Sequence, residues 1–243
     1  MKNWPLLILF IPFISFFQNG QTEWKEVNLN YYLSYIKSYE KKMGLEDDYS
    51  FSLTYNVYSD YSDASPIKMI KGYIVSKKGV GYNTLWGNQL TVINNTLKVT
   101  LEKTKKRIII QSVDSLLSKR TELQTYSNMA KFANKIFEKQ EKDKVWFDVQ
   151  LKKNMAINSV DLIFYKGQLQ KIVIFSNHPY QVKSNQASTK KAKIVITYSN
   201  FKKGRDVKLS KFEPVSSIIT VKNNKIVLNP IYKGFKIIDL RSN

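Results

Sequence analysis

The sequence predicts an α+β protein: an antiparallel β half-barrel of about ten or more strands, with an N-terminal helix and a central helical lid. Three observations predict this class. Short segments rich in Val, Ile, Thr and Tyr recur along the chain, separated by turn residues. Two other segments carry their apolar residues at helical spacing. No Pro- or Ser-rich linker and no internal repeat interrupts the chain, so we expect a single domain over residues 22–243.

Residues 1–21 have the layout of a secretory signal peptide. Lys2 precedes the run 6–17, which is apolar at all but two positions, and polar residues follow. Twelve helical residues span about 18 Å, less than the roughly 30 Å of a bilayer core, so a transmembrane anchor is the less favoured alternative. Because the chain has no Cys, it can carry no lipoprotein anchor. We expect cleavage near Gly20 or Gln21 and a periplasmic protein.

Residues 27–44 follow the pattern of an amphipathic helix. Asn28 can cap the first turn, and Gly44 can adopt the left-handed conformation that ends a helix. Three acidic residues, 46–48, then make a polar turn. The apolar positions near helical spacing are Leu29, Tyr32, Leu33, Ile36 and Met43.

A meander of six strands is expected next. The first strand has the clearest pattern, because Phe51, Leu53, Tyr55 and Val57 alternate with polar residues and so share one buried face. Gly72 lies inside the second strand, where it indicates a bulge or a close approach of two backbones. The six ranges are 49–59, 68–76, 80–85, 89–93, 96–101 and 107–113.

Residues 115–143 are predicted to form one or two helices that act as the lid. Their apolar stripe consists of Leu123, Tyr126, Ala130, Ala133 and Phe137, widened by Met129, Phe132 and Ile136. Lysines and Glu138 occupy the other side. The strands expected after the lid are 145–151, 160–165, 169–175, 193–201, 218–221, 225–228 and 235–240.

The chain is strongly basic, with 39 Lys+Arg against 19 Asp+Glu. Only four of the basic residues are Arg, the side chain that reads phosphates and base edges best. A Lys excess beside many Asn, Ile and Tyr is typical of the codon bias of an AT-rich genome. We therefore expect no nucleic-acid partner.

The excess charge is concentrated in residues 183–243, which carry a net charge of +11. This third of the chain suits an anionic partner, such as a lipid headgroup, an acidic glycan or an envelope protein. A solvated lysine surface is the alternative interpretation. The basic candidates are Lys190, Lys191, Lys193, Lys202, Lys203 and Arg205.

Catalytic and metal-binding chemistry is poorly represented. The absence of Cys excludes disulfides, thiolate metal sites and cysteine nucleophiles, and the single His178 excludes multi-His metal sites. His178 lies in a loop sequence without a nucleophile elbow. The acidic residues 46–48 are consecutive, so they lack the alternating spacing of a calcium loop and indicate a polar turn. Asp60 and Asp63 lie in a loop, and a glycosidase-type carboxylate pair is the less favoured interpretation there. We expect no enzyme activity, no metal and no cofactor.

Several segments resemble the periplasmic lipoprotein-carrier-like (LolA/LolB-like) superfamily. They are residues 71–75, 81–82, 91–97 and 107–110, and the tail from Ile226 through Tyr232 to Asp239. The resemblance implies a half-open antiparallel barrel whose mouth is plugged by helices. It also implies an apolar cavity through which a protein of this superfamily shuttles or senses lipoproteins in the periplasm.

The remaining constellation of residues is apolar, and ordinary core packing is its alternative interpretation. We hypothesise a non-enzymatic periplasmic carrier or sensor that binds an acylated or hydrophobic ligand, such as a lipid or lipoprotein. The alternative function is an envelope structural or interaction module that docks an anionic partner through the basic C-terminal surface. The candidate cavity residues are Phe51, Leu53, Tyr55, Val57, Tyr73, Val75, Met129, Phe132, Ile136, Ile163, Ile172 and Ile174.

Overall fold

A computed structural model describes residues 23–43, 47–113, 127–179, 190–223 and 225–241. The predicted signal peptide lies outside these residues. The only helix of more than four residues among them is α1 (Leu29–Met43). The four 3₁₀ segments are η1 (Gly204–Asp206), η2 (Leu209–Lys211), η3 (Val215–Ser217) and η4 (Pro230–Tyr232). The strands are β1 (Lys25–Glu26), β2 (Tyr49–Tyr58), β3 (Lys68–Lys77), β4 (Gly81–Trp86), β5 (Gln89–Ile93), β6 (Leu97–Glu102), β7 (Arg107–Ser112), β8 (Ala133–Glu141), β9 (Lys144–Leu151), β10 (Ile157–Tyr165), β11 (Gln168–Ser176), β12 (Lys193–Lys203), β13 (Ile219–Lys222), β14 (Lys225–Leu228) and β15 (Lys236–Asp239).

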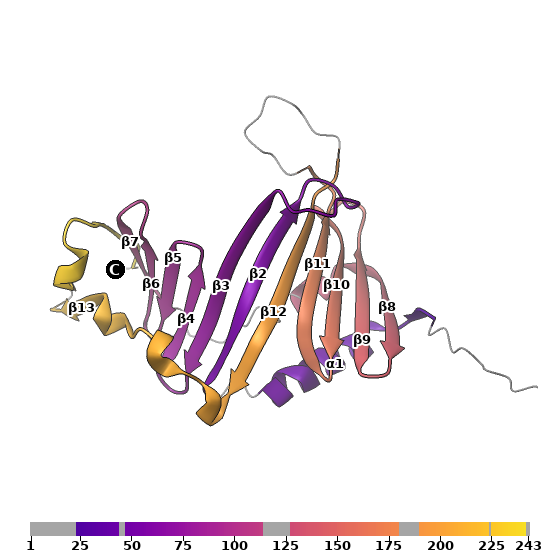
Figure 1. Cartoon of the computed structure of the whole chain (residues 1–243), viewed down its shortest axis with the longest axis horizontal. Coiled ribbons are helices and arrows are strands. Elements are labelled where there is room, and N and C mark those ends of the chain that lie inside the picture. The colour runs from indigo at the N-terminus through magenta and orange to yellow at the C-terminus, as the bar shows by residue number, and fades with distance from the viewer. Residues whose placement is uncertain (1–22, 44–46, 114–126, 180–189, 224, 242–243) are drawn as a thin grey trace, which may run out of the picture.

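Thirteen of the strands form one sheet, in the order β1-β8-β9-β10-β11-β12-β2-β3-β4-β5-β6-β7-β15. The long strands β2, β3 and β12 run through its middle (Figure 1). All neighbouring strands are antiparallel except β7 and β15, which are parallel. Two meanders make up the sheet, β2–β7 and β8–β12, and the pairing of β12 with β2 joins them.

The helix and the first long strand form where local sequence predicts them. The Asn28 side chain accepts a hydrogen bond of 2.8 Å from the backbone N–H of Tyr31, so it caps α1 as expected. In β2, Leu53 and Val57 are buried while the intervening residues are partly exposed. Both elements follow from patterns that span only a few residues.

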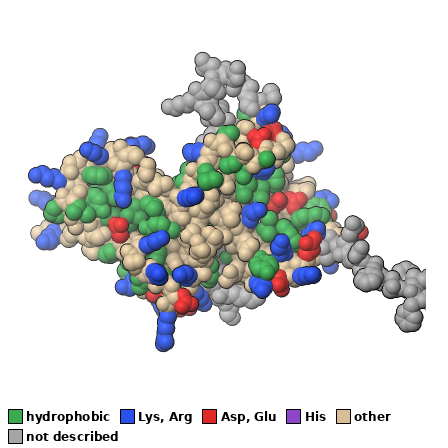
Figure 2. Space-filling view, in the orientation of Figure 1, with side chains coloured by type: hydrophobic (Ala, Val, Ile, Leu, Met, Phe, Trp, Pro, Cys, Tyr) green, Lys and Arg blue, Asp and Glu red, His purple; other side chains and the backbone are tan. Residues whose placement is uncertain are grey.

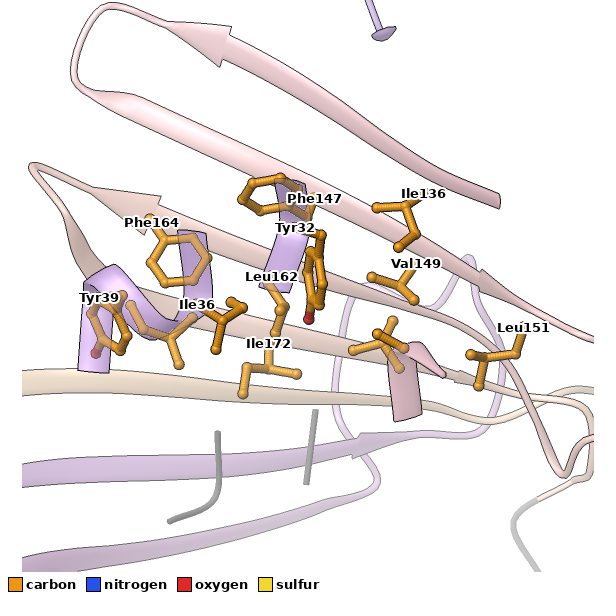
Figure 3. Close-up of a cluster of buried hydrophobic side chains, with 13 residues drawn as sticks. Tyr32, Ile36, Tyr39, Ile136, Phe147, Val149, Leu151, Leu162, Phe164 and Ile172 are labelled. Atoms are coloured by element: carbon orange, nitrogen blue, oxygen red, sulfur yellow. The ribbon is translucent and has the colours of Figure 1, made fainter. Parts of the chain in front are cut away.

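The first core lies between α1 and the sheet, over strands β8 to β11. Tyr32 and Tyr35 meet the Phe147 ring edge-on at centroid distances of 5.3 and 4.9 Å. Tyr39 packs in the same way on Phe164, at 5.1 Å. Figure 3 shows Tyr32, Tyr39, Phe147 and Phe164 with Ile36, Leu162 and Ile172 between helix and sheet. We call the side of the sheet that α1 covers the helix face.

The second core lies on the other side of the sheet, which we call the opposite face. Paired residues on neighbouring strands point to the same face of the sheet. Ile172 is paired with Ile196, and Ile196 with Tyr55 of β2. Across β3 the helix face continues to Thr84 of β4, and then to Thr91, Thr100 and Ile109 on β5, β6 and β7. The buried residues that alternate with these therefore point to the opposite face. There they pack under η3 and the β13–β14 hairpin; they are Leu90, Val92, Val99, Leu101, Ile108 and Ile110.

The prediction of a half-barrel is wrong. The protein is mostly β, and its sheet is open and neither closed nor curled, with β1 and β15 as its two edges. A half-barrel encloses its core on one concave face. Here α1 covers one end of the sheet on the helix face, and the β13–β14 hairpin covers the other end on the opposite face, so no single inside exists.

The predicted central helix is wrong over residues 133–141, which form strand β8. Lys142 adopts a φ of 48° and turns the chain into β9, and β8 pairs with β9 over eight residue pairs. Ala133, Ile136 and Phe137 have a spacing that fits a helix, but pairing with a neighbouring strand overrides it. Met129 lies in a single helical turn at 127–130, Phe132 follows it, and residues 114–126 lie outside the described residues.

Gly72 is a position of close approach, as expected, and the pairing of β3 is unbroken there. A Cβ on this residue would lie 2.3 Å from the carbonyl oxygen of Leu85 and 3.2 Å from the Leu53 side chain. The neighbouring backbone must move to admit it.

We expect Gly72→Ala to lower the free energy of unfolding by about 3 kcal/mol, the upper part of the usual range for overpacking. Urea denaturation monitored by circular dichroism measures this. The control is Gly79→Ala, where nothing lies within 4 Å and only a φ of +70° opposes the change; about 1 kcal/mol is expected there. Equal losses in the two variants would show that the contact with Leu85 does not matter.

Candidate functional site

The predicted cavity residues are divided between the two faces of the sheet. Tyr73, Val75 and Ile163 point to the opposite face. Met129 and Phe132 precede β8, and the Phe132 side chain is 50% exposed. The other seven share the helix face: Phe51, Leu53, Tyr55, Val57, Ile136, Ile172 and Ile174. The structure thus brings together the larger part of the predicted set, and its role in binding a ligand stays a prediction.

Five of the predicted residues are packed against other protein atoms. Leu53, Val57, Val75, Ile136 and Ile172 each expose less than 9% of their surface. Such residues contribute to the core whether or not a ligand binds. Any contact with a ligand must therefore come from the residues that keep part of their surface accessible.

Partly exposed aromatic rings lie on the helix face across β12, β2 and β4; we call Phe51, Tyr55, Trp86 and Tyr198 the aromatic strip. Phe51 meets Tyr198 edge-on at 5.5 Å, and Tyr55 meets Trp86 at 5.2 Å. The second contact reaches across β3 beside Gly72, which has no side chain to separate the rings.

Two residues of the strip, Trp86 and Tyr198, were not predicted from the sequence. A signal for Tyr198 was present, because Ile194, Ile196 and Tyr198 alternate with other residues along β12. Trp86 directly precedes a turn, so only the register of β4 against Gly72 places it on the helix face. The strip is thus assembled from strands that are far apart in the sequence.

A second feature is a cavity of about 790 Å³ at the C-terminal end of β12, which we call the basic groove. It contains Lys202, Lys203 and Arg205, three of the predicted basic candidates. Lys and Arg side chains are otherwise spread over the visible surface (Figure 2). The groove is lined by Gln168, Phe201, Lys202, Lys203, Arg205, Asp206, Val207 and Lys208.

The other three basic candidates do not join this groove. Lys193 begins β12, and Lys203 ends it, which separates the two by about 30 Å. The Lys193 ammonium donates a hydrogen bond to the carbonyl of Tyr61 at 2.5 Å and lies 4.6 Å from the centre of the Tyr58 ring. The Lys191 ammonium lies 3.5 Å from the side-chain oxygen of Asn177, and Lys190 is exposed. The predicted basic surface is therefore two separate clusters.

The acidic turns hold the backbone in place. Asp48 accepts a hydrogen bond of 2.8 Å from the N–H of Lys78, and Asp47 lies 3.3 Å from the Lys203 ammonium. Asp60 accepts two hydrogen bonds from Ser62, and these lower the pKa of Asp60. Among the described residues, no group of three His, Asp or Glu side chains is placed to hold a metal ion.

A pair of carboxyl groups on the opposite face was not predicted. Asp148 and Asp161 are directly opposite each other on β9 and β10. Burial, and then the nearby Asp148, raise the pKa of Asp161 to about 7. Burial also raises the pKa of Asp148, although a hydrogen bond of 2.9 Å from Gln150 opposes that shift. No local pattern marks the two residues, because only the strand register brings them together.

No family model matches the sequence, and no curated protein matches it. The structure is similar to that of a LolA superfamily protein from Nitrosomonas europaea, with a TM-score of 0.32 and 12% identity over 74% of this chain and 96% of that one.

A second similar structure is a DUF1329 family protein from Desulfovibrio piger, with a TM-score of 0.37 and 7% identity. That match covers 76% of this chain and 97% of the other. In the part of the chain that the structure describes, no helix has the length and apolar character needed to cross a membrane.

The carboxyl pair predicts a pH-dependent stability. Because the folded state raises the pKa of Asp161 to about 7, it binds a proton more tightly than the unfolded chain does. This contribution to stability is present below about pH 4 and is lost as the pH rises through 7. We expect Asp161→Asn to melt at a higher temperature than the parent at pH 8, and this advantage to shrink toward pH 4.5.

Thermal melting by circular dichroism at pH 4.5, 6 and 8 measures the difference. The control is Asp143→Asn in the exposed turn between β8 and β9. If the parent and Asp161→Asn change in parallel over this range, the buried pair does not carry the pH dependence.

Proposed function

We propose that this protein binds an apolar, acyl-type ligand on the helix face of its sheet and acts as a carrier or sensor of acylated molecules. The observation that carries the proposal is the aromatic strip, whose rings remain partly exposed beside a well-packed core. Partly exposed aromatic side chains of this kind offer apolar contact area to a ligand.

The strip suits a ligand of variable shape. Its rings touch edge-on, and Ile194 and Ile196 lie beside them on β12 with part of their surface exposed. Aromatic and aliphatic side chains of this kind line most small-molecule sites. Each CH₂ group buried there contributes about 0.8 kcal/mol, so a chain of a dozen carbons offsets the loss of translational freedom on binding.

The predicted export of the chain supports the same role. A signal peptide over residues 1–21 and no lipid anchor correspond to a protein that moves through the periplasm. An acyl chain in that aqueous compartment needs a protein surface to shield it. The function requires no metal, cofactor or catalytic group, and its partners are lipids or the acyl chains of lipoproteins.

The two tryptophans of the sheet provide a direct test. Trp86 belongs to the strip, whereas Trp146 of β9 points to the opposite face. We expect a brominated fatty acid to quench the fluorescence of a variant that retains Trp86 as its only Trp in the sheet. A variant that retains Trp146 instead should be quenched little. Trp24 is changed to Phe in both.

The strip is further tested by charge. We expect Tyr55→Glu to weaken fatty-acid binding by at least tenfold, about 1.4 kcal/mol, because a carboxylate would enter an apolar surface. Thr54→Glu places the same charge on the opposite face of β2 and is the matched control. Both variants are first shown to be folded by circular dichroism. In the fluorescence test, equal quenching of Trp86 and Trp146, or no quenching of either, would overturn the proposal.

A further inference from the structure

We propose that the basic groove binds a phosphate group, either free or as the headgroup of a lipid. Four of its eight lining residues are cationic, and one, Asp206, is acidic. Cations that line one cavity repel one another, and an anion bound among them offsets that repulsion. The charge of the groove therefore identifies the sign of its ligand.

Within the residues that the structure describes, most cations of the groove have no carboxylate partner. Lys203 is paired, since its ammonium lies 3.3 Å from the carboxylate of Asp47. In the described part of the chain, none of Lys202, Arg205 and Lys208 lies within ion-pair distance, 4.0 Å, of a carboxylate. Three positive charges thus remain available to a ligand. The groove cations differ in this from Lys191 and Lys193 at the other end of β12, because the ammonium groups of those two lysines bind protein oxygens.

The backbone that carries these side chains is held in place. Lys202 and Lys203 pair with Ser50 and Tyr49 of β2. The N–H of Gly204 donates a hydrogen bond of 2.8 Å to the carbonyl of Asp48, and Val207 is buried. A site with a fixed backbone loses less conformational entropy when it binds than a mobile one does.

The side-chain types suit a phosphate group. Arg205 offers the planar fork that binds two phosphate oxygens at once, and Lys202 and Lys208 add compact charges. The amide of Gln168, which also lines the groove, is a further hydrogen-bond donor. A cavity of about 790 Å³ is larger than one phosphate ion needs, so it leaves room for a group esterified to it.

The groove adjoins the apolar surface described above. Phe201 lines the groove and also packs against the cluster of Tyr49, Leu53 and Ile74, to which Phe51 and Tyr198 of the aromatic strip belong as neighbours. An amphiphile with a phosphate headgroup can therefore occupy groove and strip together. This lipid form of the inference rests on the proposed function, whereas binding of free phosphate does not.

The test compares a groove variant with a matched one. Lys202→Gln/Arg205→Gln removes two groove charges, and Lys190→Gln/Lys191→Gln removes two charges at the other end of β12. Binding of inorganic phosphate and of soluble dihexanoyl phosphatidic acid is measured by isothermal titration calorimetry at 150 mM salt. We expect the groove variant to bind both probes at least tenfold more weakly than the parent, and the matched variant to differ from the parent by less than twofold.

The two probes distinguish the sources of the phosphate. Much tighter binding of phosphatidic acid than of inorganic phosphate identifies a lipid headgroup, and comparable binding identifies free phosphate. Equal losses in both variants, or no binding of either probe to the parent, would overturn the inference. Quenching of Trp86 by a brominated fatty acid is also measured in the groove variant, and it does not depend on phosphate binding. A failed phosphate-binding proposal and a failed fatty-acid-binding proposal are therefore distinguished.

Discussion

The antiparallel pairing of β12 with β2 is the interaction on which the rest of the structure depends. These strands lie about 140 positions apart in the sequence, yet nine residue pairs join them. Each meander alone would expose a long unpaired edge, and an open edge is a site of misassociation. The pairing turns two meanders into one sheet. It also aligns the two faces of one half with those of the other, because paired residues point to the same face. Examples are Ile196 with Tyr55 and Tyr198 with Leu53.

Both candidate sites are located at this junction. The aromatic strip consists of rings from β12, β2 and β4, and the basic groove opens where β12 leaves the sheet. The acidic turn before β2 secures that end, because Asp48 binds the backbone of both Lys78 and Gly204. The same contacts that join the halves therefore set the distance between an apolar surface and a cluster of cations. An amphiphile requires that combination.

Because the two cores lie on opposite faces, no covering element extends over the helix face at the junction of β12 and β2 among the described residues. On the helix face α1 packs over β8 to β11, and at the other end the cover lies on the opposite face. Between them the helix face of β2 to β4 is occupied by large, half-buried side chains that pack on one another. Apolar surface is thus retained where each covering element ends, rather than being gathered in one enclosed cavity.

Local sequence was enough to determine most elements of this protein. The strand pattern of β2, in which Leu53 and Val57 are buried, and the cap at Asn28 are signals within a few residues, and the structure contains both. The strand β8 was misassigned, because a spacing of three and four residues satisfies a helix until β9 is placed beside it.

Only the tertiary structure decided which residues share a surface. The placement of Trp86 beside Gly72, the carboxyl pair of Asp148 and Asp161, and the separation of Lys203 from Lys193 all follow from strand register and order. A residue pattern specifies that a strand has two faces, but long-range pairing selects its neighbours. Composition therefore determined that this chain is basic and rich in β structure, while the pairing of distant strands determined where charge and apolar surface meet.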